Sequence, residues 1–323
     1  MLKNLILSAS AIALAACAFP TTTLAQDHES HEHDAPSETS ASGPALWQVS
    51  DEDTTIYLFG TIHILPEGLD WLNPTVEQAL VSSNQFVSEV DTSAIPDYDP
   101  ASGTPPPPEI MAIAQMQMSL AQLTTGGTLR DLMNDEDRAE YEAAMTGLGV
   151  PVAAFDGFEP WFAAMSMTQI AIMRAGLNAS NGVERVLDQH IEGKERTALE
   201  TVEQQLGFFD SLPMESQLAF LDEGAESLAE EGVMEATFQQ MVGEWMEGDP
   251  VGLASVINDA MDDPVLYDTL LTRRNANWAE WIDARLDQPG TVFIAVGAGH
   301  LAGESSVQDF LEQRGIAAER IEY

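Results

Sequence analysis

Cysteine and basic residues are scarce in this chain. Cys17 is the single cysteine among 323 residues, and it lies close to the N-terminus. A disulfide within the chain and a thiol nucleophile in the folded part are therefore both excluded. Only 12 Lys and Arg oppose 53 Asp and Glu, so the formal net charge is −41. Such a charge repels nucleic acid and anionic lipid headgroups, and neither is expected as a partner.

Several motifs of well-known enzymes are also absent. The chain has no His-Glu-x-x-His helix, which argues against a familiar zinc protease. It has neither Gly-x-Gly-x-x-Gly nor a Walker pattern, and an enzyme acting on nucleotides or nucleic acid is disfavoured. What the chain does have is 45% hydrophobic residues, enough for a real core. We attribute its acidity to a salty environment, and such a field attracts divalent cations to any cleft.

The N-terminus has the features of an export signal. A short basic start is followed by an apolar run from Leu5 to Phe19 and by small residues up to Ala25. The run is shorter than the roughly 20 apolar residues that span a bilayer. Cleavage after Ala25 makes residues 1–25 a signal peptide. Leu14-Ala15-Ala16-Cys17 instead resembles a lipobox, which makes residues 1–16 a lipoprotein signal and Cys17 a lipid anchor. Both alternatives place the mature protein in the periplasm or cell envelope.

Residues 26–44 are polar and lack apolar periodicity, which predicts a disordered linker. This linker holds three of the six histidines, His28, His31 and His33. A histidine-rich tract can collect metal ions, but here no packed scaffold fixes its geometry. A solvated tail is therefore the simpler interpretation.

Two runs near opposite ends of the folded part share one pattern. Residues 54–59 and 291–296 are β-branched and aromatic, and each run leads into Gly-x-x-His, at Gly60–His63 and Gly297–His300. Each predicts a buried strand with a glycine at its end, where the backbone can turn sharply or approach a ligand. The folded part has one other histidine, His190, which we interpret as a helix-end or surface residue.

The remaining chain predicts one α+β domain over 45–323, with a mixed, partly parallel sheet and a large helical insertion. Asn73-Pro74 predicts the start of a helix between the strands at 54–59 and 85–91, which gives a β-α-β unit. Further strands are predicted at 45–49, 197–201, 291–296 and 318–323. Further helices are predicted at 109–123, 129–145, 160–174, 182–191, 203–210, 215–228, 235–247, 250–258, 266–286 and 306–314, and the prolines at 105–108 predict a stiff spacer.

Parallel strands place their C-terminal ends at one edge of a sheet, where ligands collect. Two histidines and one or two glutamates at such an edge suit a divalent metal site with room for water. His63, His300 and Glu89 are the candidate ligands. Each has a simpler explanation, because single histidines are more often core residues and Glu89 could be a cap or an ion-pair partner. Glu200, after a later strand, is the weaker candidate. Arg274 is either a surface cation or the partner of a buried carboxylate or a substrate oxygen.

An ordered set of short motifs resembles the TraB/GumN proteins, which are related to the Tiki proteases and to pheromone-shutdown proteins. The motifs extend over 45–323. They are Leu58-Phe59-Gly60-Thr61-Ile62-His63, Ser88-Glu89-Val90-Asp91, Gly182-Val183-Glu184, Leu199-Glu200-Thr201, Glu203-Gln204-Gln205-Leu206, Arg274-Asn275 and Val296-Gly297-Ala298-Gly299-His300-Leu301. The resemblance implies an erythromycin-esterase-like or Tiki-like α+β fold. It also implies a site of two histidines, a glutamate and an arginine, matched by His63, His300, Glu89 and Arg274. Glu184 departs from the pattern, because relatives carry aspartate there, and a ligand role for it is doubtful.

Activity in the Tiki relatives is divalent-metal-dependent proteolysis. The leading hypothesis is therefore an exported metal-dependent hydrolase, a peptidase acting on a peptide or protein substrate. His63, His300 and Glu89 would hold a Mn, Co or Zn ion, with Glu200 as supporting partner or general base and Arg274 at the developing oxyanion. The alternative is a non-catalytic envelope protein that binds peptide or polysaccharide during assembly of surface polymer. The sequence fixes neither the substrate nor the oligomeric state.

Overall fold

The computed structural model describes residues 43–91, 95, 96, 98, 103–177, 181–229, 232–258 and 261–322. The export signal, Cys17 and the three tail histidines lie outside these residues, so the predictions made for them stay predictions. Within the described part, no helix is both long and apolar enough to cross a membrane.

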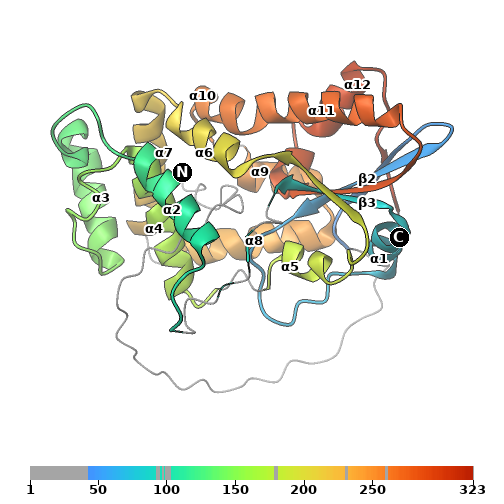
Figure 1. The fold of residues 1–323 in the computed structure, drawn as a ribbon. Helices are drawn as coiled ribbons and strands as arrows, with labels where there is room; N and C mark the ends of the chain where they lie inside the picture. The colour runs from blue at the N-terminus through green and yellow to red at the C-terminus, as the bar shows by residue number, and fades with distance from the viewer. Residues whose placement is uncertain are drawn as a thin grey trace.

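The described strands form one mixed sheet of six strands (Figure 1). They are β1 (Leu46–Ser50), β2 (Thr54–Thr61), β3 (Gln85–Val90), β4 (Glu195–Glu200), β5 (Gly290–Gly297) and β6 (Glu319–Arg320). Their spatial order is β4-β3-β5-β2-β1-β6. The four strands β4, β3, β5 and β2 run parallel, while β1 and β6 extend the sheet in antiparallel pairing. The predicted α+β class with a partly parallel sheet is confirmed.

Helices account for most of the rest of the described chain. The α-helices are α1 (Pro74–Ser82), α2 (Pro108–Leu120), α3 (Asp135–Gly147), α4 (Pro160–Arg174), α5 (Val183–Asp188), α6 (Val202–Asp210), α7 (Met214–Ala229), α8 (Val233–Glu247), α9 (Pro250–Ile257), α10 (Pro264–Tyr267), α11 (Arg273–Leu286) and α12 (Val307–Gln313). Short 3₁₀ helices cover Leu129–Leu132 and Ala298–Leu301, and a π-helical turn covers Asp268–Thr272. At α1, Asn73 caps the helix by accepting from the backbone N–H groups of Thr75 and Val76, as the sequence predicts.

Three hydrophobic clusters show how these layers pack. One face of the sheet packs against α1, α5, α8 and α9, and its centre is an aromatic group of Phe59, Trp71, Phe86, Trp245 and Phe293. The other face packs against α11 and α12 through residues such as Trp278, Ile282 and Leu311. A separate all-helical core joins α3, α4, α6 and α7, which Figure 1 shows on the side of the molecule away from β1 and β2. Helices therefore cover both sheet faces, and the helical part extends the protein sideways.

Several predicted element boundaries are wrong, and local caps explain two of the differences. The single helix predicted at 129–145 is a 3₁₀ turn followed by α3, because Met133 is extended and Asn134 then caps a new helix. The predicted spacer at 105–108 is shorter than expected, because Pro107 is the cap of α2 and Pro108 is its first residue. The helix predicted at 266–286 is interrupted by the π turn, and the last strand is only Glu319–Arg320.

Register brings the two Gly-x-x-His motifs side by side. In the parallel β2–β5 pair, Gly60 lies opposite Val296 and Thr61 lies opposite Gly297. The two strand ends are thus offset by a single residue. A Cβ added to Gly60 would lie 3.0 Å from the Cα of Ala298, a tighter contact than almost all real Cβ atoms make, so the Ala298 segment would have to shift by a few tenths of an ångström. Glycine therefore fits position 60 best, because the two strand ends approach so closely.

We expect Gly60→Ala to destabilise the protein by about 1–3 kcal/mol, because the new methyl group meets backbone and must push β2 and the Ala298 segment apart. Gly207→Ala is the matched control. Position 207 lies within α6, and a Cβ there meets nothing within 4 Å. That substitution should be neutral or stabilising by up to about 1 kcal/mol. Urea unfolding measures the free energy of unfolding of both variants. Equal losses would contradict the close approach of the two strand ends.

Candidate functional site

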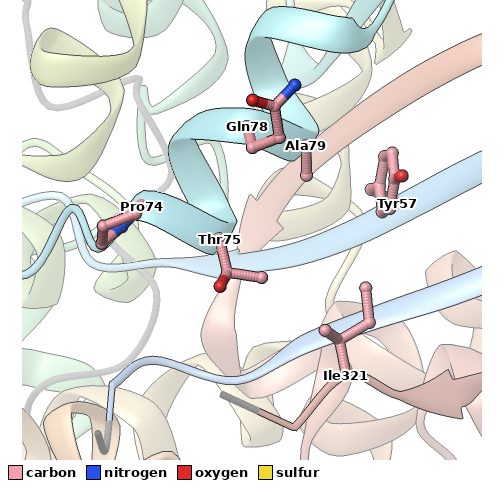
Figure 2. Close-up of a pocket in the computed structure, with 6 residues that line it drawn as sticks. All are labelled: Tyr57, Pro74, Thr75, Gln78, Ala79 and Ile321. Carbon is pink, nitrogen blue, oxygen red and sulfur yellow. The ribbon is translucent and has the colours of Figure 1, made fainter.

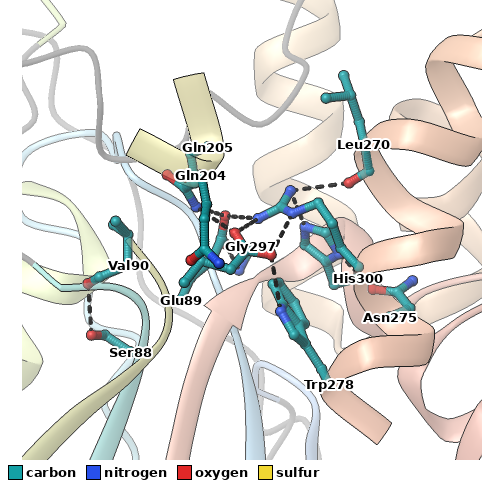
Figure 3. A network of polar contacts seen from close by, with 12 residues as sticks. Ser88, Glu89, Val90, Gln204, Gln205, Leu270, Asn275, Trp278, Gly297 and His300 are labelled. Atoms are coloured by element: carbon teal, nitrogen blue, oxygen red, sulfur yellow. Dashed lines mark hydrogen bonds and ion pairs between the residues drawn. The ribbon is translucent and has the colours of Figure 1, made fainter. Parts of the chain in front are cut away.

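A buried arginine organises the polar cluster at the C-terminal edge of the parallel strands (Figure 3). Arg274, at the start of α11, is 2% exposed. Its Nε and Nη2 donate to the two carboxylate oxygens of Glu200, each at 2.8 Å. Nη2 also donates to Oε1 of Glu89, and Nη1 donates to the carbonyl of Leu270 and to Nε2 of His300, each at 3.0 Å. All five N–H groups of the guanidinium thus have a partner inside the protein.

The two carboxylates are tied together by further donors. Glu89 Oε2 accepts from the backbone N–H of Gly297 at 2.9 Å, and Glu200 Oε1 accepts from Trp278 Nε1 at 3.0 Å. Gln205 Nε2 bridges them, at 2.9 Å from Glu89 and 3.0 Å from Glu200. Burial alone would raise the pKa of Glu89, but the charges of Arg274 and His63 and the hydrogen bond from the N–H of Gly297 hold it far below its usual range. Glu89 is therefore ionised at neutral pH.

His300 is fully buried and neutral. Burial and the charge of Arg274 lower its pKa to about 3. Arginine can only donate, so Nε2 of His300 accepts from Arg274 and the ring proton lies on Nδ1. That Nδ1 is 2.6 Å from Oδ1 of Asn275, and the ring packs on Trp278 with centroids 4.3 Å apart. Both ring nitrogens are thus in use within the protein.

His63 is in a different state. Its side chain is 21% exposed, and Nδ1 lies 2.7 Å from Oε1 of Glu184. Nε2 has no hydrogen-bond partner among the described residues. Burial would lower the pKa of His63, but the charge of Glu184, its contact with Nδ1 and the charge of Glu89 raise the pKa to about 9. His63 is therefore an imidazolium at neutral pH, and its Nε2–H is an uncommitted donor.

Glu184 reaches His63 because α5 begins beside the end of β2. The backbone N–H of Val183 donates to the carbonyl of Ile62 at 3.0 Å, which fixes the first turn of α5 next to His63. The negative charge of Glu89 acts on His63, and His63 in turn affects the pKa of His300. The structure therefore gathers all five residues predicted from the sequence, His63, Glu89, Glu200, Arg274 and His300, into one region at one sheet edge.

The predicted metal centre does not match this arrangement. His63 fits a metal ligand, because its Nδ1 is held by a carboxylate and its Nε2 has no partner. Glu89 and His300 do not, because Arg274 occupies the oxygen and the nitrogen that would bind the ion. In the described part of the chain, no group of three or more His, Cys, Asp or Glu side chains is placed to hold a metal ion.

Comparison with known proteins identifies the family. The model of the TraB/PrgY/gumN family matches residues 45–320. The chain belongs to the TraB/PrgY/gumN family. An uncharacterized protein from Treponema pallidum (strain Nichols) is 22% identical over 284 residues, which cover 83% of this chain and 80% of the relative.

A second relative is the uncharacterized protein YbaP of Escherichia coli (strain K12). It is 24% identical over 257 residues, which cover 79% of this chain and 87% of the relative, and the YbaP protein of Shigella flexneri matches to the same extent. No solved structure matches the chain.

In this TraB/PrgY/gumN chain, the sequence pattern did not assign roles to four residues of the site. Glu184, Gln205, Asn275 and Trp278 all contact a predicted site residue. Glu184, Gln205 and Asn275 lie inside motifs quoted for the resemblance, whereas Trp278 lies outside them. The motifs therefore marked the location of three of the four residues, while only the contacts show what each side chain holds.

A shallow groove elsewhere on the protein contains none of these residues. Figure 2 shows it between α1, β2 and the C-terminal segment, lined by Tyr57, Pro74, Thr75, Gln78, Ala79 and Ile321. No lining residue is charged, and none is a histidine, cysteine or acid. The candidate site is therefore His63 together with the cluster of Arg274, Glu89, Glu200 and His300, and not this groove.

Replacing Arg274 by methionine should destabilise the protein by about 3–5 kcal/mol, because the carboxylates of Glu89 and Glu200 are left buried without their cation. Arg273→Met is the matched control, since the Arg273 side chain is 68% exposed and forms a surface ion pair with Asp268. It should change stability by no more than about 0.5 kcal/mol.

Urea unfolding compares the two. If Arg274→Met does not fold, adding Glu89→Gln and Glu200→Gln should recover part of the loss, because the unpaired charges are then removed. Equal stability of the Arg274 and Arg273 variants would contradict the conclusion that Arg274 stabilises the two buried carboxylates.

Proposed function

We propose that this TraB/PrgY/gumN protein is an exported hydrolase that cleaves peptide bonds, with His63 as the proton donor. The observation that carries the proposal is the state of His63. One ring nitrogen is held by Glu184 at 2.7 Å, and the other is a donor without a partner. A charged imidazole paired with a carboxylate, at the C-terminal ends of parallel strands where ligands collect, is suited to proton transfer.

Hydrolysis of an amide requires a proton on the leaving nitrogen, and His63 holds one at neutral pH. Its raised pKa keeps the ring charged, and the charged ring can also donate to a carbonyl oxygen as negative charge develops there. The Arg274 cluster has a different part in this proposal. Its five N–H groups are all in use, so it holds Glu89, Glu200 and His300 in place instead of contacting a substrate oxygen.

Two parts of the proposal rest on the sequence. Export follows from the apolar N-terminal run, with the lipid anchor at Cys17 as its second form. The peptide substrate follows from the resemblance to the Tiki proteases. The non-catalytic alternative, an envelope protein that binds peptide or polysaccharide, requires no proton donor, and no contact in the described residues favours it over hydrolysis.

The pH dependence of hydrolysis tests the role of His63. The acid form predominates below the pKa of about 9, so activity should be present near neutral pH and lost as the pH rises through about 9. Glu184→Gln removes the carboxylate that raises this pKa, so the alkaline loss should move about one pH unit or more lower. Glu192→Gln, an exposed charge change in the turn after α5, should leave the profile unchanged.

The assay measures cleavage of a peptide library by wild type, the two glutamate variants and His63→Ala. His63→Ala should lose about 10²-fold or more in kcat. Activity that persists in His63→Ala, or an alkaline limb that Glu184→Gln does not move, would contradict the proton-donor role. Absence of any cleavage by wild type would favour the non-catalytic alternative.

The metal content of the protein distinguishes the metal site that the resemblance implies from the arrangement seen in the structure. The resemblance implies one Mn, Co or Zn ion per chain at His63, His300 and Glu89, whereas Arg274 blocks two of these ligands. We therefore expect no stoichiometric ion in a chain whose tail carries His28→Ala, His31→Ala and His33→Ala. Elemental analysis after dialysis against each ion measures this. One bound equivalent that His63→Ala abolishes would show that the ion displaces Arg274 and would restore the metal-dependent form.

A further inference from the structure

Asn275 contacts the site with one end of its side chain and a neighbouring turn with the other. It directly follows Arg274 on α11 and is 1% exposed. Its Oδ1 lies 2.6 Å from Nδ1 of His300, and Figure 3 shows the amide beside the ring. Its Nδ2 donates to the carbonyl of Ser305 at 2.8 Å. The amide therefore links His300 to the turn that follows it in the chain.

The two ends of this chain of contacts fix the direction of every hydrogen bond in it. Nη1 of Arg274 can only donate, so Nε2 of His300 accepts at 3.0 Å and Nδ1 carries the ring proton. The carbonyl of Ser305 can only accept, so the NH₂ end of Asn275 faces it and Oδ1 accepts from Nδ1. Turning over the ring or the amide would set two donors or two acceptors against each other. Asn275 is therefore matched to one tautomer and one orientation of His300.

The turn that Asn275 holds has an unusual backbone. Ser305 has a φ of 58°, the one positive value at a non-glycine residue in the described chain. This conformation is disfavoured for a residue with a Cβ and persists where surrounding contacts hold it. The hydroxyl of Tyr267 donates to the carbonyl of Glu304 at 2.7 Å, and Asn275 donates to the next carbonyl. Side chains of α10 and α11 therefore hold Ser305 in its left-handed conformation.

We propose that Asn275 is a positioning residue of the site, which holds the His300 ring in the orientation that Arg274 requires and anchors the left-handed turn at Ser305. This inference goes beyond the proposed hydrolysis, because it concerns how the framework of the site is held, and its tests use no substrate. Without Asn275, the Nδ1–H of His300 is a buried donor that has lost its acceptor, and the ring is no longer fixed against Arg274.

Two substitutions separate the two ends of the Asn275 amide. Asn275→Leu has a similar volume and removes both hydrogen bonds, whereas Asn275→Asp keeps an acceptor for His300 and loses the donor to Ser305. Asn277 provides the matched controls, Asn277→Leu and Asn277→Asp, because it is exposed on the same helix. All variants are made in the full chain.

The ring proton of His300 reports the first contact. In protein labelled with ¹⁵N-histidine, the nitrogen chemical shifts and couplings identify the ring nitrogen that carries the proton. The rate at which this proton exchanges with water shows how firmly it is held. Signals of the other histidines are identified by their loss in variants, which are His63→Gln, His190→Gln and a chain with His28→Ala, His31→Ala and His33→Ala.

We expect a proton on Nδ1 and none on Nε2 of His300 in the wild-type protein. Asn275→Leu should exchange this proton about tenfold faster or more, while Asn275→Asp and Asn277→Leu should keep the rate within about threefold of wild type. A wild-type Nδ1 without a proton, or an unchanged exchange rate in Asn275→Leu, would overturn the proposal.

A double-mutant cycle with Ser305→Gly tests the second contact, and it decides if Asn275→Leu does not fold. Glycine takes a positive φ without the penalty of a Cβ, so the turn in Ser305→Gly depends less on its anchor. We expect Asn275→Asp to lower the Tm by several degrees in the wild-type background and by about half as much in the Ser305→Gly background. Asn277→Asp should leave the Tm within about 1 °C in both backgrounds. Equal losses for Asn275→Asp in the two backgrounds would show that Asn275 does not hold the turn, which would overturn the proposal.

Discussion

The enclosure of one guanidinium between two buried carboxylates is the constraint on which the rest of the site depends. Arg274 comes from α11, Glu89 from the end of β3 and Glu200 from the end of β4, so a single side chain fixes the positions of three elements. Two carboxylates at this depth would repel each other, and a lone guanidinium would lose its hydration. The three groups can therefore be buried at this depth only together. His300 becomes neutral because the same cation faces its ring.

The sheet edge thereby holds two histidines in opposite states. His300 is neutral and has partners at both nitrogens, which makes it part of the framework. His63 is charged, partly exposed and paired at one nitrogen only. Identical Gly-x-x-His motifs therefore lead to different roles, because the neighbour of one is a cation and the neighbour of the other is Glu184. Environment decides protonation here, as it does wherever two like groups occupy one site.

Much of the fold and the location of the site could be predicted from the sequence. Alternating and β-branched runs identified the strands, and the rule that parallel strands end at one edge predicted that His63, Glu89 and His300 would lie together. The roles of Gln205 and Trp278 could not be predicted, because a buried amide and an indole match ordinary core or surface patterns. The pairing of Arg274 with Glu89 joins positions 185 residues apart, and no local pattern specifies such a contact. The metal site was predicted from residue types, whereas its fit depends on which atoms remain available.

The π-helical turn at Asp268–Thr272 has a consequence for how this chain can change length. Such a turn contains one residue more than the α-helix would have in the same place, and it ends two residues before Arg274. Each residue of an α-helix advances the side-chain direction by about 100°. Deleting one residue here would restore a regular helix and rotate either α10 away from its neighbours or Arg274 away from both glutamates. The helix that enters the site therefore tolerates substitution at its exposed positions far better than it tolerates the deletion of a single residue.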